Sequence, residues 1–206
     1  MKETVKTQGQ GKLFRYPFLE VFTKAPPLVS ACVYATVVII LLYKATSLSI
    51  TDQAGKAILI FIGAFFSWTL FEYFAHRYLF HLDVHFPNSK LAAKLAYVFH
   101  GIHHEFPHDT NRILMPPLPG LIILSILFLF FSLLLGSYVY LFIPGFMTGY
   151  LTYTFVHFQT HALKVPSFLK KQKKHHALHH YKFPDKAFGV SSPLWDWVFG
   201  TMPPAK

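Results

Sequence analysis

The chain contains little charge, few acids and almost no cysteine. Of its 206 residues only 14% are charged, and nine acidic residues stand against 19 lysines and arginines. Soluble domains are nearer a quarter charged, so this composition favours a chain whose solvent is partly lipid. The single cysteine, Cys32, excludes a disulfide framework and any cysteine-based zinc or iron–sulfur site.

Long hydrophobic runs take the place of the missing charge, and 53% of the residues are hydrophobic. The four runs lie at about 26–43, 57–76, 118–136 and 138–158. A membrane-spanning helix needs about 20 residues, so each run is long enough, or nearly so, to cross a bilayer. The sequence therefore predicts an all-α integral membrane protein with four transmembrane helices.

The distribution of basic residues predicts the topology. Four crossings place both termini on one side, and only Lys44 and Lys56 fall in the loops expected on the other side. By the positive-inside rule the termini are cytoplasmic, in a bacterial inner membrane or the endoplasmic reticulum. Because topology accounts for the basic excess, we expect no nucleic-acid partner. The first 24 residues lack an apolar signal segment, so we expect no cleavable signal peptide.

Between the apolar runs the chain is polar and aromatic. Residues 1–25 are expected to form a polar arm with an interfacial segment, and residues 26–206 a single membrane domain. Within that domain, residues 77–117 and 159–206 are expected to form a cytoplasmic helical cap. Helices are predicted there over Ser89–His104 and Ser167–Tyr181.

Histidine is the chemically informative residue type in this cap. Ten of the 13 histidines fall in four clusters, each at the cytoplasmic mouth of an apolar segment. Neutral imidazole is the commonest metal ligand, so four clusters returning to one side predict a single polynuclear metal site. The clusters are His76 and His81; His100, His103 and His104; His157 and His161; and His176, His179 and His180.

Helical spacing predicts how these rings divide between two metals. Residues i and i+4 share a helix face, while a neighbour of either is rotated by about 100°. His76 and His81, five residues apart, would diverge by roughly 140° on a regular helix, so we expect one on each metal. The two expected sets are His100, His104, His176 and His180 with one of that pair, and His103, His157, His161 and His179 with the other.

Other polar residues near the clusters are not expected to bind the metals directly. His85, His108 and His175 are expected to be structural or solvated. Carboxylates often accept the outer N–H of a metal-binding imidazole. The candidates for that role are Glu72, Asp83, Asp109 and Asp185.

All-nitrogen ligation suits zinc, copper, iron or nickel and disfavours magnesium and calcium. Ten ligands exceed one tetrahedral zinc centre, whereas two five-coordinate metals match the count. A pair of redox-active irons is one such site, able to activate O₂ with an open position on each metal.

The clusters and their surroundings resemble a known family. His100-Gly101-Ile102-His103-His104 runs through Pro107 and Asp109 to Arg112, and a Trp-Asp-Trp-Val-Phe-Gly-Thr run ends at Thr201. Over roughly residues 60–201 the chain resembles the membrane fatty acid 2-hydroxylases of the sterol desaturase and fatty acid hydroxylase superfamily. That resemblance implies O₂-dependent hydroxylation at C2 of a long acyl chain, of a ceramide or other sphingolipid or of a free fatty acid. It also implies that the ten histidines bind two irons, with zinc as a substitute in purified protein.

The same resemblance implies an external electron donor. Many eukaryotic relatives begin with a haem-binding cytochrome b5 domain, but no histidine here precedes His76. The chain therefore resembles a form without that domain, and a separate cytochrome b5 or ferredoxin type of donor is expected. The basic stretch Lys170–Lys174 either docks an acidic donor or serves as a solvated, positive-inside helix face.

Two alternatives remain open on sequence grounds. One is a sterol, carotenoid or sphingoid-base hydroxylase or desaturase of the same superfamily. The other is a non-enzymatic membrane protein that binds or transports metal. A transporter is expected to hold polar ligands near the bilayer midplane, whereas these histidines all lie toward one face. Whether the acyl acceptor is a free acid, a thioester or an amide is likewise open.

Overall fold

The computed structural model describes residues 5–6 and 9–204. Residues 1–4 and 7–8 of the expected arm, and residues 205–206 of the expected cap, lie outside the described residues. Throughout the described ranges the regular structure is helical, which confirms the all-α prediction.

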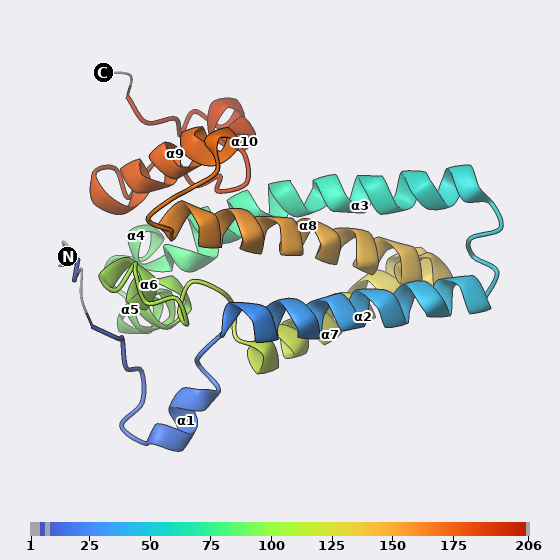
Figure 1. The fold of residues 1–206 in the computed structure, drawn as a ribbon, viewed down its shortest axis with the longest axis horizontal. Coiled ribbons are helices and arrows are strands. Elements are labelled where there is room, and N and C mark those ends of the chain that lie inside the picture. The colour runs from blue at the N-terminus through green and yellow to red at the C-terminus, as the bar shows by residue number, and fades with distance from the viewer. Residues whose placement is uncertain (1–4, 7–8, 205–206) are drawn as a thin grey trace.

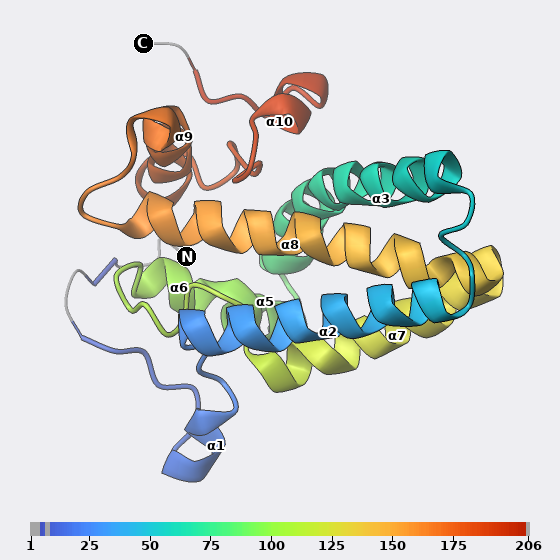
Figure 2. The ribbon, with the colours of Figure 1, turned by 45° about the vertical axis from the view of Figure 1, so that its right-hand side comes forward.

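Four long helices overlap the four apolar runs (Figures 1 and 2). They are α2 (Pro27–Ser47), α3 (Ala54–Phe74), α7 (Pro117–Leu135) and α8 (Val139–His161). Three stretches are long and apolar enough to cross a membrane: Pro27–Ser47, Ala54–Phe80 and Pro117–His161. The third contains both α7 and α8, which run in opposite directions on either side of the short 3₁₀ turn η3 (Gly136–Tyr138).

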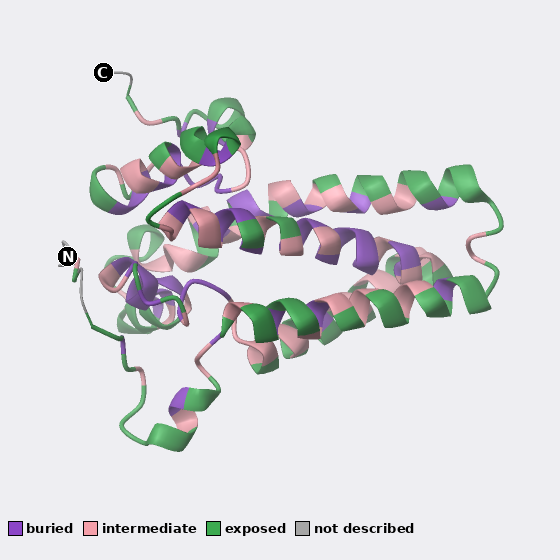
Figure 3. Cartoon of the chain, in the orientation of Figure 1, coloured by how far each residue is buried: buried purple, intermediate pink, exposed green. Residues whose placement is uncertain are grey.

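Helix α8 lies at the centre of the bundle, where it packs on α3 and α2 and is the most buried of the four (Figure 3). Two glycines one turn apart allow its close approach to α3. A Cβ at Gly145 would meet the backbone oxygen of Phe61 at 2.3 Å, and one at Gly149 would meet Trp68 Cβ at 2.6 Å. Small residues at i and i+4 are a common way for apolar helices to pack in a membrane.

The outward faces of the bundle are apolar. Leu28, Leu59 and Leu133 are 76%, 74% and 87% exposed, on three different helices. Soluble monomers rarely expose continuous apolar surface on this scale. The exposed faces therefore fit a lipid environment.

The cap gathers at one end of the bundle, where both ends of the described chain also lie (Figure 1). The connection between α3 and α7 contributes five short helical segments, and the chain after α8 contributes three. These are η1 (Ala75–Phe80), α4 (Leu82–His85), α5 (Lys90–Ala96), η2 (Tyr97–Gly101) and α6 (Ile102–Glu105), then η4 (Ser167–Leu169), α9 (Lys170–Tyr181) and α10 (Leu194–Val198).

Both helices expected in the cap are present. The N-cap of α5 is Ser89, whose hydroxyl accepts the amide of Ala92 at 3.2 Å. The helical path then continues through η2 and α6, beyond His104. The second expected helix, Ser167–Tyr181, is formed by η4 and α9.

Arg112 joins the N-terminal arm to the cap. Its guanidinium forms a buried ion pair with Glu20 of α1 (Pro17–Val21) and donates from Nε to the carbonyl of Gly11 at 2.9 Å. It also reaches the Thr23 hydroxyl at 3.1 Å and lies 3.8 Å from Asp109. A buried charge is tolerated only when it is paired and hydrogen-bonded, so these contacts fix the arm against the cap.

The glycine contact between α8 and α3 generates a first prediction. Gly149→Ala is expected to lower stability by about 1–3 kcal/mol, because the added methyl group overpacks against Trp68. Thermal denaturation in detergent measures the effect. Gly63→Ala is the matched control, since a Cβ there meets nothing within 4 Å. Equal melting temperatures for the two variants would show that the close approach is unimportant.

Candidate metal centre

The ten clustered histidines come together in two groups of five at the cap end of the bundle. Within each group the candidate ligand nitrogens all lie within 4.8 Å of one another, and most of the rings are buried. The first group is His76, His81, His100, His104 and His179; the second is His103, His157, His161, His176 and His180.

His76 and His81 lie in the same group, so the expectation that they diverge is wrong. The reason is local: residues Ala75–Phe80 form a π-helix rather than an α-helix. A π-turn hydrogen-bonds i to i+5, which brings residues five apart onto one face. The two ring centroids are accordingly 5.3 Å apart.

Helix faces divide the two triplets as expected. In α6 and the turn before it, His100 and His104 point to the first group and His103 to the second. In α9, His176 and His180 point to the second group and His179 to the first. The expected pairing of the triplets is wrong, however, because each of these helices lies between the two groups. His179 therefore joins His100 and His104, and His103 joins His176 and His180.

The ring nitrogens converge at short distances. In the first group, His76 Nε2 lies 3.1 Å from His100 Nε2, and His81 Nε2 lies 3.1 Å from His179 Nε2. In the second group, His176 Nε2 lies 2.9 Å from His161 Nε2 and 3.0 Å from His180 Nε2.

The outer nitrogens decide which tautomer two of these rings adopt. His76 Nδ1 lies 2.6 Å from the Phe188 carbonyl and His179 Nδ1 lies 2.8 Å from the Lys186 carbonyl. A carbonyl oxygen only accepts, so each Nδ1 carries the proton. When such a ring is neutral, its Nε2 presents a bare lone pair to the centre of the group.

Burial keeps the cap rings neutral. It is the largest cause that lowers the pKa of His103, His176 and His179 well below the ordinary value, and neighbouring histidines lower it further. Burial likewise lowers the pKa of His81 to about 3. The groups are therefore clusters of uncharged imidazoles.

The four carboxylates expected to accept from these imidazoles do not do so in the described part of the chain. Glu72 is buried but accepts from the amides of Val190 and Ser191. Asp109 accepts from the Gly11 amide and lies near Arg112. Asp83 is half-buried, and Asp185 is exposed. Backbone carbonyls, together with the Tyr153 hydroxyl 3.1 Å from His157 Nδ1, take the role instead.

Sequence reasoning missed Asp196, which is fully buried beside the first group. It accepts from the amides of Phe188 and Gly189 and lies 3.0 Å from His175 Nε2. Burial raises the pKa of this carboxyl, but its hydrogen bonds outweigh that effect and hold the pKa below the usual range. The sequence feature that could have indicated Asp196 was its position as a lone acidic residue between Trp195 and Trp197.

The three remaining histidines lie outside both groups. His175 is buried against Asp196, while His85 and His108 are exposed. His85 hydrogen-bonds the Arg77 carbonyl at 3.0 Å. These positions agree with the structural or solvated roles expected for them.

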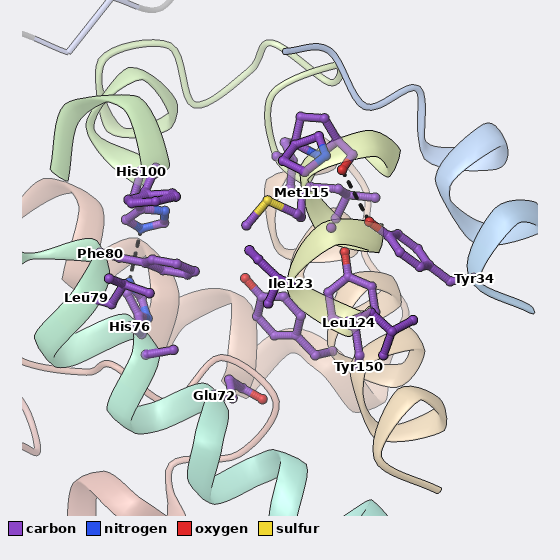
Figure 4. Close-up of a pocket in the computed structure, with 18 of the residues that line it drawn as sticks. Tyr34, Glu72, His76, Leu79, Phe80, His100, Met115, Ile123, Leu124 and Tyr150 are labelled. Carbon is purple, nitrogen blue, oxygen red and sulfur yellow. Dashed lines mark hydrogen bonds between the residues drawn. The ribbon is translucent and has the colours of Figure 1, made fainter. Parts of the chain in front are cut away.

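An apolar cavity of about 240 Å³ adjoins the first group (Figure 4). It lies between α3, α7 and α8, and the N-terminal arm contributes Leu13, Phe22 and Thr23 to its wall. Two histidines of the first group, His76 and His100, line the cavity directly. Other lining residues are Tyr34, Glu72, Leu79, Phe80, Met115, Ile123, Leu124 and Tyr150.

Several curated proteins are similar to this chain. The ceramide very long chain fatty acid hydroxylase SCS7 of Saccharomyces cerevisiae is 38% identical over 195 residues, which cover 94% of this chain and 50% of that protein. The fatty acid 2-hydroxylase of Rattus norvegicus is 36% identical over 70% of this chain and 41% of its own length. The dihydroceramide fatty acyl 2-hydroxylase FAH2 of Arabidopsis thaliana is 38% identical over 68% and 59%. The chain thus spans about half the length of these relatives.

A solved structure of full-length scs7p, with only its hydroxylase domain visible, has a similar fold. It shares 36% identity and a TM-score of 0.85 over 96% of this chain and 74% of that one. The sequence pattern of the fatty acid hydroxylases matches residues 61–201, from the middle of α3 to the end of the cap. With this match and the two histidine groups, the chain belongs to the fatty acid hydroxylase family.

Proposed function

We propose that the two histidine groups each hold one metal ion and that the chain hydroxylates C2 of a long acyl chain. The observation that carries the metal proposal is the convergence of buried Nε2 atoms at about 3 Å in both groups. A cation at the centre of each group would be coordinated by the Nε2 lone pairs that converge there.

The residues fit a metal in both distance and chemistry. Ligands about 2.0–2.1 Å from an ion and at right angles to one another are about 2.9 Å apart, close to the observed separations. In the second group both ring nitrogens of His103 and Nε2 of His157 are buried without a hydrogen-bond partner among the described residues. Buried polar atoms require a partner, and an ion supplies one.

Imidazole ligands suit iron, and also zinc in purified protein. Iron bound here supplies the O₂ chemistry that puts one oxygen atom into a C–H bond and releases the other as water, with two electrons from an external donor and two protons. The chain's own residues supply position. Because His76 and His100 line the cavity, an acyl chain lying there has its reacting end beside the first group.

The cavity wall favours an amide-linked acyl chain over a free fatty acid. Among the described lining residues, the only lysine or arginine is Arg112, and its guanidinium is already bonded to Glu20, Gly11 and Thr23. The wall thus offers a free carboxylate no unpaired cationic side chain, and burying a charge without such a partner is costly. The relatives named for ceramide and dihydroceramide support the same choice.

In the membrane, we propose that α7 and α8 cross separately, which gives four crossings and a cytoplasmic cap. The two helices run in opposite directions, and each has the length of a span. The arm would then lie at the interface, where exposed Phe18 and Val21 of α1 meet lipid while Glu20 holds the cap. Residues 26–206 would form one membrane hydroxylase domain.

The donor of electrons is proposed to dock on α9. Lys170, Lys171 and Lys174 are exposed there, whereas His176 and His179 on the same helix are buried in the two groups. Positive side chains on a surface attract an acidic partner and orient it. A donor on this face would be separated from both groups by one helix.

The proposed topology predicts opposite accessibility for two exposed positions. Asp52 lies in the turn between α2 and α3, and Lys171 lies on α9. In a Cys32→Ala background, D52C and K171C should be labelled from opposite faces of sealed vesicles by a membrane-impermeant maleimide. Labelling of both from the same face would contradict the four-crossing arrangement.

The lowered histidine pKa values predict a sign for the pH dependence of stability. An unfolded histidine has a pKa near 6.5, whereas the buried cap rings titrate well below it. As the pH falls below about 6.5 the unfolded chain therefore binds protons first, and stability is progressively lost. Metal binding has the same sign, because a ligand ring must be deprotonated.

Melting temperatures between pH 8 and pH 5 measure this effect. The expected curve is flat above about pH 7 and falls below about pH 6.5. His85→Gln combined with His108→Gln should leave the shape unchanged, because both rings are exposed. A melting temperature that stays constant down to pH 5 would be inconsistent with buried neutral rings.

The activity itself is tested by lipid mass spectrometry. Cells that express the chain should gain 2-hydroxylated acyl groups in their sphingolipids, and the C2 position is checked by fragmentation. His103→Ala and His179→Ala should each reduce the product at least 100-fold, because a metal loses a ligand; His108→Ala should retain most activity. Hydroxyl groups on sterols or on the sphingoid base instead would refute the assignment.

A further inference from the structure

Residues 186–191, between α9 and α10, form a segment that touches the outer side of the first histidine group. Its two carbonyls at Lys186 and Phe188 accept the Nδ1–H groups of His179 and His76 at 2.8 and 2.6 Å. Each bond fixes the tautomer and the orientation of a ring whose Nε2 points to the centre of the group. The position of this segment therefore sets the position of two rings.

Two buried carboxylates hold the segment from behind. The four consecutive amides of residues 188–191 donate to them at 2.8–2.9 Å, the first two to Asp196 and the last two to Glu72. Asp196 is itself fixed by Thr201 Oγ1 at 2.7 Å and His175 Nε2 at 3.0 Å. Glu72 lies one helical turn before His76, so the contact returns to the helix that carries a ring of the group.

The backbone conformation shows that the segment is constrained. Ala187 is fully buried and has a φ of 59°, a region that residues with a Cβ rarely adopt. A Cβ at Gly189 would meet the Ser192 carbonyl oxygen at 2.2 Å and an Asp196 oxygen at 2.9 Å. Such strain persists only where the surroundings impose it and is concentrated at functional sites.

The second group has no such support in the described part of the chain. Its outer contact is a side chain, the Tyr153 hydroxyl 3.1 Å from His157 Nδ1. Nδ1 of His176 and Nδ1 of His180 are buried without a hydrogen-bond partner among residues 5–6 and 9–204. The segment that the two carboxylates hold thus contacts the rings of the first group.

We propose that Asp196 and Glu72 are positioning residues which, through residues 186–191, set the metal affinity of the first group and leave that of the second unchanged. The inference rests on the proposed two-metal site. Outer partners of metal-binding imidazoles typically change metal affinity by 10–100-fold. The two proposed metal sites therefore differ in how strongly the surrounding protein fixes the position of their ligand rings.

The test is a cobalt titration of the purified full chain in detergent, followed by Co²⁺ absorption in the presence of a competing chelator. Asp196→Asn removes a carboxylate charge with little change of shape. It should weaken one of the two sites 10–100-fold and leave the other at wild-type affinity. Asp185→Asn, the same exchange at an exposed neighbour of the segment, should bind both ions as the wild type does.

Two reference variants identify the weakened site. The residual Co²⁺ spectrum of D196N should match that of His81→Ala, which lacks a first-group ring, and not that of His161→Ala, which lacks a second-group ring. Two wild-type affinities in D196N, or equal weakening of both sites, would overturn the inference. If D196N does not fold, Glu72→Gln is measured for the same one-site signature. A wild-type chain that binds fewer than two ions refutes instead the proposed two-metal site.

Discussion

Ten uncharged imidazoles aim their nitrogens at two points inside a buried cap, where their lone pairs would bind a positive charge. Protonation does not provide the charge, because burial lowers the pKa of the cap rings. The segments that supply the rings are also far apart in sequence, from the end of α3 to α9. In the proposed holoprotein an ion in each group would join these segments.

The sequence predicts those parts of the site that follow from side-chain spacing along a helix. It does not predict those that depend on backbone conformation or on helix packing. The division of His100, His103 and His104 between two groups follows from the rotation per residue of a helix. The co-location of His76 and His81 does not, because the chain forms a π-turn there, and the spacing rule of a regular α-helix does not describe it. How α6 and α9 face each other is also a property of packing, so the pairing of the triplets was wrong although each triplet was divided correctly.

The outer partners of the rings illustrate the same limit. Carboxylates were the expected partners because acidic residues can be read directly from the sequence. His76 and His179 instead donate to backbone carbonyls, which any residue could provide. The carboxylates act one step further out, on the amides of the same segment. Asp196 was identifiable only as an acid in an apolar run, and its partners lie on elements that a linear pattern does not connect.

Charge is used differently on the two sides of the apolar cavity. On the arm side, Arg112 and Glu20 neutralise one another, so the wall presents mainly hydrocarbon to its contents. On the opposite side, Glu72 is held by amides and by the Ser191 hydroxyl rather than by a cation. The wall thus offers a lipid bound between them no free lysine or arginine side chain, which is consistent with a substrate whose polar group is neutral.

The order of the ligands along the chain has a consequence for biosynthesis. Rings from α9 complete both histidine groups, and Asp196, which braces the first group, follows still later in the sequence. All four long helices are therefore synthesised before either group has its full set of nitrogens. In the proposed two-metal protein, neither ion can therefore gain all five of its rings until α9 has been synthesised.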